Sequence, residues 1–379
     1  MEILHIIPAG ASSLIPLAEV LQREDKVNTH TFFVCVAFQA VLKSNIELLK
    51  IRDLQFMPIF GRMKMLRKIL YLRKRMNAAD RIVWHSLRTN DGYSPFFLKL
   101  FPKIRKKSVW IPAEGEIGNY MSVSNRLLNR YASRVTRFVQ NNVGWVGTAT
   151  PSDMEIFRGN ENRTAELVCL PTVMTAEQMA TLERARTMTE EPPRKTACFV
   201  QVGQSSLRVN GHDVLLKALK RKKDAVNACV CVPFRYALRG TAFSAGTKVY
   251  MNQIRATGKK MPYRCFYPLK TVEEKDYLKL LHRMDIVLLG NSSTCQMGML
   301  LCQLAMKKRI FLPESSPLYS YLNEKGAGVY SLDQFRHTET LEELMELPGS
   351  CLPDEVLDTF RAENAAAQWI RFFQNDQNR

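Results

Sequence analysis

The sequence predicts an α/β protein built from two halves, each with a parallel sheet flanked by helices. Short apolar runs alternate with helical stretches in both halves, which is typical of parallel sheets whose strands are joined by helices. A polar, proline-containing stretch at residues 187–195 separates the two series and predicts a linker. The 379 residues are enough for each half to bury its own core.

The N-terminal half, residues 1–186, begins with an apolar strand at 1–8. The other elements expected there are strands at 31–38, 81–85, 107–112, 145–150 and 167–170, and helices at 12–22, at 125–137 and from 151. After the linker at 187–196, the second half, 197–352, is expected to hold strands at 197–203, 227–232, 285–289 and 309–312, and helices at 212–220, 275–283 and 297–306. The segment 353–379 is expected to be a C-terminal helix.

Length and composition exclude several classes of protein. No apolar run approaches the ~20 residues that a membrane-spanning helix needs. The N-terminus has neither the basic region nor the cleavage site of a secretory signal. The nine cysteines form no CxxC pair and no zinc spacing, which indicates reduced, mostly buried thiols in a cytoplasmic protein.

The formal net charge of +18 predicts an anionic partner: nucleic acid, an acidic membrane surface or phosphorylated small molecules. Two clusters, at 62–75 and 96–107, mix bases with large apolar residues, and the first has seven bases and no acid. This mixture suits an anionic lipid interface, and an ordinary packed helix with a solvated basic face is the alternative. A third basic cluster, at 217–223, closes a helix and is expected to face solvent. No nucleic-acid-binding motif is present, so we expect no nucleic-acid partner.

A glycine-containing turn follows the first strand of the second half and opens a helix. Ligands of doubly wound sheets bind at the carboxyl ends of strands, glycine permits close backbone approach, and helix N-termini attract phosphate. The turn is neither a Walker A loop nor a clean GxGxxG. The sequence therefore favours a diphosphate site, with a plain polar connection as the alternative. Its candidate binding residues are Gly203, Ser205, Arg208, Asn210 and His212.

Two further strand ends carry candidate residues for a ligand. Tyr236 lies just past the strand at 227–232, where it would stack on a base or sugar, or else pack in the core. The Ser- and Thr-rich loop at 290–298 leads into a helix that starts near Met297, and this arrangement also suits a diphosphate.

At these positions the chain resembles the bacterial 4-acetamido-4,6-dideoxygalactose (Fuc4NAc) transferase family, known from assembly of enterobacterial common antigen. The similarity lies in order and spacing over about residues 3–325. It is carried by Val202-Gly203-Gln204-Ser205 with Arg208, Asn210 and His212 (VGNS…RxNxH in the family), Val232-Pro233 with Tyr236 (VVPMGY), Tyr277-Leu278 through Asp285 (YLxLLxxCD), Gly298 with Leu300 (GIGTL), Pro317 (NPF), Trp84-His85 (FFHG), Ala149-Thr150 with Asp153 (ATRGD) and Pro171-Thr172 (FPT). The chain departs from the family at Thr294-Cys295-Gln296 and, against WGADLY, at Glu114-Gly115-Glu116-Ile117.

The resemblance implies a GT-B fold, which is two Rossmann-like domains with an interdomain cleft. It implies that the second domain binds a dTDP-sugar or similar nucleotide-sugar donor, with Gly298 among the substrate-binding residues. The first domain would hold an undecaprenyl-diphosphate-linked glycan, and transfer would be inverting, with no cofactor or catalytic metal. The family is peripheral on the cytoplasmic face of the inner membrane, which agrees with the membrane interpretation of the clusters at 62–75 and 96–107.

An inverting sugar transfer needs a base that takes the proton of the acceptor hydroxyl. In the N-terminal half the candidates are Glu114, Glu116, Asp153 and His85, with a helix cap or a surface charge as the alternative role of each. Two alternative functions remain open at the level of the sequence. One is a UDP-sugar-dependent GT-B transferase for capsule or O-antigen. The other is a non-catalytic nucleic-acid-binding or scaffold protein with degenerate GT-B halves.

Overall fold

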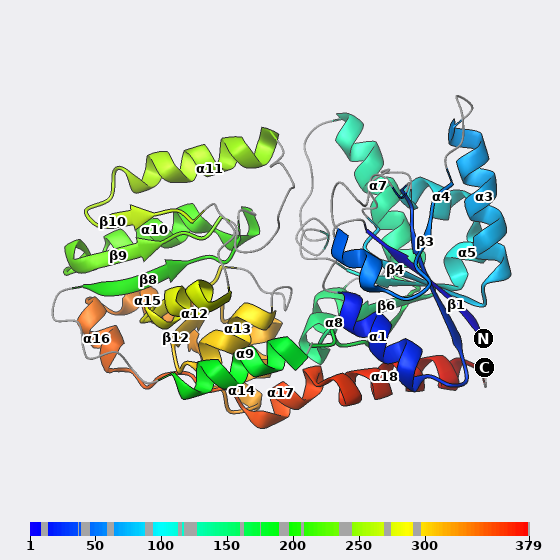
Figure 1. Cartoon of the computed structure of the whole chain (residues 1–379). Coiled ribbons are helices and arrows are strands. Elements are labelled where there is room, and N and C mark those ends of the chain that lie inside the picture. The colour runs from blue at the N-terminus through cyan, green and yellow to red at the C-terminus, as the bar shows by residue number, and fades with distance from the viewer. Residues whose placement is uncertain are drawn as a thin grey trace. The chain divides into compact units, whose positions relative to one another are not determined.

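A computed structural model describes residues 1–8, 14–36, 38, 46–58, 64–87, 94–112, 116, 127–159, 163–174, 176–188, 197–205, 208–234, 245–268, 274–290 and 297–377. Its contacts divide the chain into two compact units (Figure 1). The first unit is Met1–Thr175 together with Thr359–Arg379, and the second is Ala176–Asp358.

The first unit contains a seven-stranded sheet in the order β3-β2-β1-β4-β5-β6-β7, and the described pairings are all parallel. The interior strand β1 (Glu2–Ile7) has five buried residues in its six, because helices cover both faces of a parallel sheet. The other strands are β2 (Thr29–Val34), β3 (Gln55–Phe56), β4 (Arg81–His85), β5 (Ser108–Ile111), β6 (Trp145–Thr148) and β7 (Glu166–Cys169). The helices are α1 (Ile15–Glu24), η2 (Ile46–Lys50), α3 (Lys64–Ala78), α4 (Ser94–Leu100), α5 (Pro102–Lys106), α7 (Leu127–Asn142), α8 (Pro151–Arg158) and α18 (Ala362–Gln377).

The second unit contains a six-stranded parallel sheet in the order β10-β9-β8-β11-β12-β13. Its strands are β8 (Cys198–Val202), β9 (Ala228–Cys231), β10 (Arg264–Phe266), β11 (Ile286–Leu288), β12 (Arg309–Leu312) and β13 (Tyr330–Ser331). Its helices are α9 (Ala176–Thr187), η3 (Arg208–Asn210), α10 (His212–Lys220), η4 (Ala225–Asn227), α11 (Ala245–Gly258), α12 (Glu274–His282), α13 (Met297–Ala305), α14 (Pro317–Glu324), α15 (Leu332–His337), α16 (Leu341–Glu346) and α17 (Asp354–Phe360).

Both sheets reverse their strand order once, and this reversal locates their ligand crevices. From β1 the chain builds outward to β2 and β3, then crosses back to β4 on the other side. The second sheet does the same from β8, crossing back to β11. Doubly wound sheets bind ligands outside the carboxyl ends of the strands at such a switch point. The crevices are therefore expected at β1/β4 in the first unit and at β8/β11 in the second.

The C-terminal helix α18 completes the first core. Trp369 is 1% exposed and Phe373 is fully buried, and both pack in one cluster with Ile3, Leu21 and Val83. The indole Nε1 of Trp369 donates to the carbonyl oxygen of Pro171 at 2.9 Å, so the buried ring keeps a polar partner. A segment at the end of the sequence thus closes the core that the first residues begin.

The contacts group the chain ends differently from the boundaries drawn on the sequence. Helix α9 packs against α13 and clusters with the second unit, although it precedes the expected linker at 187–196. The expected helix at 353–379 consists of two helices, α17 and α18. Residues up to Asp358 group with the second unit and those from Thr359 onward with the first, so the boundary falls within α17. Residues 189–196 lie outside the described residues. In the part of the chain that the structure describes, no helix has the length and apolar character required to cross a membrane.

Candidate functional site

The turn after β8 is shaped by a glycine that cannot be another residue. Gly203 has a φ of +73°, and a Cβ placed on it would lie 2.4 Å from the Nε2 of His212. Its backbone N–H donates to the carbonyl oxygen of Leu288 at 2.8 Å, which ties the turn to the end of β11. Only glycine combines the left-handed backbone with this close approach.

Asn210 holds the same turn from inside. Its side chain is fully buried, and its Oδ1 accepts from the backbone N–H of Gln204 at 3.1 Å. Its Nδ2 donates to the Ser205 Oγ at 3.0 Å. Three predicted binding residues, Gly203, Ser205 and Asn210, are therefore brought together, and Asn210 shapes the turn.

His212 opens helix α10 and is fully buried. Its Nδ1 lies 2.9 Å from the Tyr250 Oη, and burial lowers the pKa of His212 to about 4, so the ring is neutral near pH 7. The exposed Arg208 stacks its guanidinium 5.2 Å from the centroid of the Tyr250 ring. Arg208 is thus a positive group held beside the turn, where its N–H donors can meet a phosphate.

The end of β11 comes very close to this turn. A Cβ on Gly290 would lie 2.3 Å from the carbonyl oxygen of Asn210. A cavity of about 640 Å³ opens next to this contact, within the second unit. Its lining comes from the start of α10, the segments that follow β11 and β12, and α15: Gly211, Val214, Leu215, Gly290, Pro313, Glu314, Ser315, Leu332, Asp333 and Arg336. This size is in the range of small-molecule sites.

The acid Glu314 in the cavity lining was not among the residues predicted from the sequence. It lies two residues after β12, which ends at Leu312. The same rule that selected the turn at Gly203 selects it too, because an acid just past a buried parallel strand lies at the ligand edge of the sheet. In dinucleotide-binding folds an acid at that edge accepts hydrogen bonds from ribose hydroxyls.

The other predicted residues of the second half are placed less fully. Gly298 lies in the first turn of α13, and a Cβ there would meet nothing within 4 Å, so close packing does not require glycine. Tyr236 and the loop at 291–296 lie outside the described residues.

In the first unit, three of the candidate bases follow neighbouring strands. His85 ends β4, Glu116 comes after β5, and Asp153 comes after β6, so all three lie toward the carboxyl edge of one sheet. Glu116 is 2% exposed, and its Oε2 accepts from the Trp110 Nε1 at 3.2 Å. Asp153 is 2% exposed in the first turn of α8, where its backbone N–H donates to the N-cap Thr150 Oγ1 at 3.4 Å.

His85 has the most unusual surroundings of the three. It is 6% exposed, and burial lowers its pKa to about 3. Its Nε2 lies 3.0 Å from the Nδ1 of His5, while its own Nδ1 is buried and has no hydrogen-bond partner in the described part of the chain. The next residue, Ser86, has a φ of +101°, an uncommon conformation that often marks functional sites. The fourth candidate, Glu114, lies outside the described residues.

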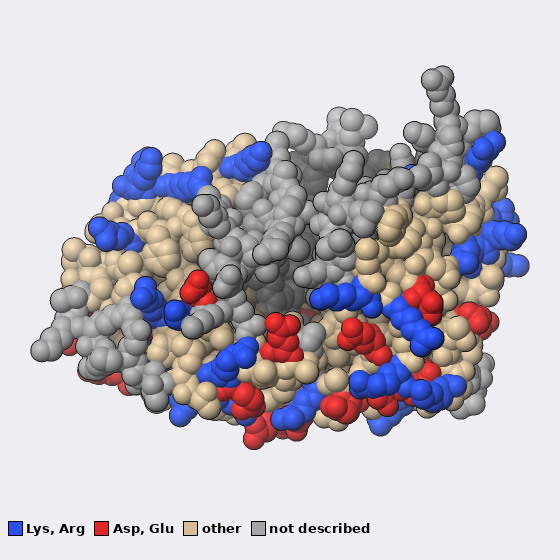
Figure 2. Space-filling view, viewed as in Figure 1, with Lys and Arg blue, Asp and Glu red and all other residues tan. Residues whose placement is uncertain are grey.

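The basic clusters expose apolar side chains together with their charges. On α3, Leu66 and Leu70 are 58% and 53% exposed, and Arg67 and Lys74 are exposed beside them. In the second cluster, Leu100 is 68% exposed. In Figure 2, Lys and Arg side chains lie on the surface at the position of α3, at the right of the view. This surface combines the two properties that an anionic lipid interface recognises.

The described residues hold no group of three or more His, Cys, Asp or Glu side chains arranged to bind a metal ion.

A family sequence model described as "4-alpha-L-fucosyltransferase glycosyl transferase group 56" matches residues 15–370. No curated protein sequence matches the chain. The fold is similar to that of sucrose-phosphate synthase from Thermosynechococcus elongatus, with a TM-score of 0.60 and 10% identity over 99% of this chain and 98% of that one. It is also similar to a glycosyltransferase from Rickettsia africae, with a TM-score of 0.55 and 13% identity over 99% and 98% of the two chains. HepE from Anabaena, solved with UDP and glucose, gives a TM-score of 0.57 and 12% identity over 99% of both chains.

These similarities, with two parallel sheets in the Rossmann strand order, confirm the predicted α/β GT-B fold of two Rossmann-like domains.

Proposed function

Because the chain belongs to the 4-alpha-L-fucosyltransferase family, glycosyl transferase group 56, it is a glycosyltransferase, and we propose its donor and acceptor. The donor is a dTDP-linked amino-deoxy sugar, Fuc4NAc or a close relative. The acceptor is an undecaprenyl-diphosphate-linked glycan of a surface polysaccharide such as enterobacterial common antigen or an O-antigen. Membership of a glycosyltransferase family argues against the alternative of a non-catalytic scaffold.

The turn at Gly203–His212 carries the proposal for the donor. It lies at the switch point of the second sheet, beside a cavity of about 640 Å³. We assign the diphosphate to this turn, where Arg208 offsets the charge of the leaving group. The nucleoside fills the cavity, and Glu314 accepts hydrogen bonds from ribose hydroxyls. HepE, which is similar in fold, was solved with UDP and glucose, which supports a nucleotide-sugar donor and makes a UDP-sugar the second candidate.

We assign the base to His85. The Glu116 carboxylate already accepts the Trp110 N–H, and Asp153 lies in the capped first turn of α8. The Nδ1 of His85 remains the unpartnered acceptor at the switch point of the first sheet. His85 takes the proton of the hydroxyl group on the acceptor glycan, and that hydroxyl oxygen attacks the anomeric carbon of the donor sugar. The diphosphate leaves with the bonding electron pair, and the configuration at the anomeric carbon inverts.

A panel of nucleotides tests the donor assignment directly. Melting temperature is measured with dTDP, UDP, GDP and ADP at equal concentration. A ligand present at 100 times its Kd adds about 2.7 kcal/mol to the stability of the form that binds it. We expect the largest rise with dTDP. A larger rise with UDP would select the second candidate, and no rise with any nucleotide would contradict a nucleotide-sugar site in the second unit.

Arg208→Ala is expected to raise the donor KM or lower kcat by roughly 10- to 100-fold, because it removes a charge-assisted contact worth roughly 1.5–3 kcal/mol. Steady-state kinetics with varied donor measure the effect. The matched control is Arg221→Ala, which removes an exposed arginine at the opposite end of α10. Equal kinetics for the two variants would remove Arg208 from the site.

The basic apolar face of α3 supports a peripheral position on the inner face of the cell membrane. Replacing Arg67, Lys68 and Lys74 by Gln is expected to weaken binding to anionic vesicles by roughly 1 kcal/mol per charge. Vesicle sedimentation at physiological salt measures the change.

The matched control for the vesicle assay removes three exposed charges elsewhere. Lys217, Lys220 and Arg221 lie in the last turn of α10 or just after it, and their replacement by Gln leaves vesicle binding unchanged if the α3 face is specific. Equal weakening by both triple variants would show that only net charge matters. No weakening by either would show that the α3 charges are merely solvated.

A further inference from the structure

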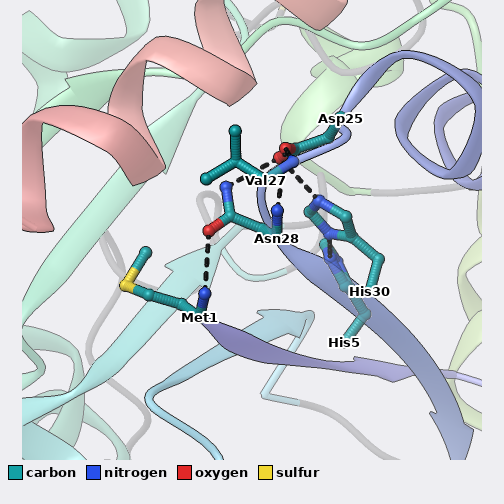
Figure 3. A network of polar contacts seen from close by, with 6 residues as sticks. All are labelled: Met1, His5, Asp25, Val27, Asn28 and His30. Carbon is teal, nitrogen blue, oxygen red and sulfur yellow. Dashed lines mark hydrogen bonds and ion pairs between the residues drawn. The ribbon is translucent and has the colours of Figure 1, made fainter.

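A row of three buried histidines, His30, His5 and His85, crosses the first sheet and ends on a carboxylate. Figure 3 shows the Asp25 end of this row, with His30 and His5. The Asp25 Oδ2 lies 2.9 Å from the His30 Nε2, and the His30 Nδ1 lies 3.0 Å from the His5 Nε2. The His5 Nδ1 in turn lies 3.0 Å from the His85 Nε2. The histidines come from the adjacent strands β2, β1 and β4, so an unbroken line of hydrogen bonds connects Asp25 with His85.

The Asp25 end of the row is held as an ionised carboxylate. Burial alone would raise the pKa of Asp25, but the hydrogen bonds that it accepts outweigh burial and lower the pKa. The backbone N–H groups of Val27 and Asn28 donate to Oδ1, each at 3.1 Å, and the Asn28 Nδ2 donates to Oδ2 at 2.9 Å. The amino group of Met1 donates to the Asn28 Oδ1 at 3.2 Å, which orients that amide. A carboxylate accepts only, so the His30 Nε2 must carry a proton.

This one constraint fixes every proton along the row. Burial lowers the pKa of His5, His30 and His85, so each ring is neutral and has one N–H and one lone pair. Since the His30 Nε2 donates to Asp25, its Nδ1 accepts from the His5 Nε2. The His5 Nδ1 then accepts from the His85 Nε2. The lone pair that remains is on the His85 Nδ1, the atom that has no partner among the described residues.

The surroundings of the row keep water away from it. His5 is fully buried, and its ring stacks on Phe32 with centroids 4.4 Å apart. Trp369 and Phe373 of α18 pack against the histidines at centroid distances of 5.5 to 6.4 Å. The hydrogen bonds of the row therefore act in a low dielectric, where they are stronger and where stray protonation is costly.

We propose that the row Asp25–His30–His5–His85 is a proton relay, with His85 as the catalytic base and Asp25, His30 and His5 as positioning residues. The inference rests on the proposed glycosyl transfer. As the acceptor oxygen forms its bond to the anomeric carbon, its proton passes to the His85 Nδ1. The His85 Nε2 proton passes to the His5 Nδ1, the His5 Nε2 proton to the His30 Nδ1, and the His30 Nε2 proton to Asp25. All three rings end neutral with exchanged tautomers, Asp25 ends as a carboxylic acid, and the diphosphate carries away the negative charge.

The relay explains how so deeply buried an imidazole can act as a base. Alone, His85 would become a buried imidazolium, which its surroundings disfavour strongly. With the relay the proton charge neutralises the Asp25 carboxylate, and no buried cation is left. In the carboxylate–imidazole pairs of hydrolases the carboxylate orients the ring and stabilises its charge without taking the proton. The proposed relay differs from them, because the proton charge reaches Asp25.

The histidine tautomers of the wild-type protein give the first test, by ¹⁵N NMR with labelled histidine at pH 7.5. We expect unprotonated Nδ1 and protonated Nε2 in His5, His30 and His85. In Asp25→Asn the tautomers should become mixed. A protonated His85 Nδ1 in the wild type would overturn the proposal, and this readout needs no substrate and no functional variant.

Kinetics give the second test. His85→Gln and Asp25→Asn are each expected to lower kcat about 10²-fold or more, the range of general base catalysis, with donor KM unchanged. Because the two residues act in the same proton transfer, the kcat of the double variant should be little lower than that of either single variant. The control Asp53→Asn alters a carboxylate of the same unit that is 81% exposed, and it should leave kcat unchanged. The relay would be wrong if the losses in kcat of the two single variants added up in the double variant, or if folded Asp25→Asn kept full activity.

Failure of the relay and failure of the proposed function give different results. If no nucleotide sugar is consumed, either by transfer to an acceptor or by transfer to water, the proposed function fails while the NMR result still decides the tautomers. If sugar is transferred at the wild-type rate by Asp25→Asn, the transferase assignment stands and the relay is wrong.

Discussion

Gly290→Ala is expected to destabilise the second unit by about 1–3 kcal/mol and to raise the donor KM at least tenfold. The new Cβ would lie 2.3 Å from the carbonyl oxygen of Asn210 and 2.9 Å from its carbonyl carbon. Both are backbone atoms, so no side-chain rotation relieves the contact, and overpacking of this kind costs that amount. Because Asn210 holds Gln204 and Ser205, a shift of its backbone moves the whole diphosphate turn.

Denaturant unfolding and donor kinetics measure the two effects. Gly246→Ala is the matched control, because a Cβ at that position in α11 meets nothing within 4 Å. It should keep the wild-type KM and gain up to about 1 kcal/mol, since alanine is the better helix former. Wild-type stability and KM in Gly290→Ala would mean that the end of β11 does not press on the turn.

Acidification from pH 7.5 to 5 is expected to lower the free energy of unfolding of each unit by about 2 kcal/mol or more. The pKa of His85 in the first unit is about 3 and that of His212 in the second is about 4, both because of burial. In the unfolded chain an imidazole has a pKa of about 6.5. Below that pH the unfolded state binds protons that the folded state excludes. The free energy of unfolding therefore decreases as the pH is lowered, until the pH reaches the pKa of the group in the folded state.

The size of the loss in stability follows from the difference between the pH and the pKa of histidine in the unfolded chain. At pH 5 that distance is about 1.5 units, and each unit is worth 1.36 kcal/mol per group. His5 and His30 have lowered pKa values as well and add to the loss in the first unit. Urea midpoints at the two pH values measure the effect, and His85→Gln should reduce the pH dependence of the first unit. Equal midpoints at both pH values would contradict neutral, buried histidines.

Local sequence patterns predicted the inner strands of the two sheets and the position of the turn, because an apolar run and a glycine before a helix are local signals. The short edge strands β3, β10 and β13 were not predicted, because runs of two or three residues carry no such signal. The strand that ends at Val202 and the helix that starts at His212 are where the sequence placed them. The pairing of α9 with α13, and of α18 with the first core, depends on packing between segments far apart in the sequence. The amino-acid composition near residues 187–195 does not indicate such long-range contacts, so it could not show which unit α9 and α18 pack against.

The sequence could predict those site residues that lie at or just after the end of a strand, because ligands of parallel sheets bind at the carboxyl ends of the strands. His85 was selected by that rule, but His5 and His30 were not, because each lies inside or at the start of an apolar strand where a histidine looks like core. Only the register of β1 against β2 and β4 brings residues 5, 30 and 85 into one line. The close approach of Gly290 to Asn210 is equally invisible in the sequence, since it joins residues that are distant along the chain.

The most direct test of the proposed transferase is sugar transfer itself, with radiolabelled dTDP-Fuc4NAc, a panel of UDP-sugars and undecaprenyl-diphosphate-linked acceptors. Label from the dTDP-sugar is expected to reach the lipid extract with wild-type protein, and at a rate reduced at least tenfold with Gly290→Ala at limiting donor. If no nucleotide sugar labelled the lipid and none raised the melting temperature, while RNA or DNA did, the protein would not be the proposed transferase.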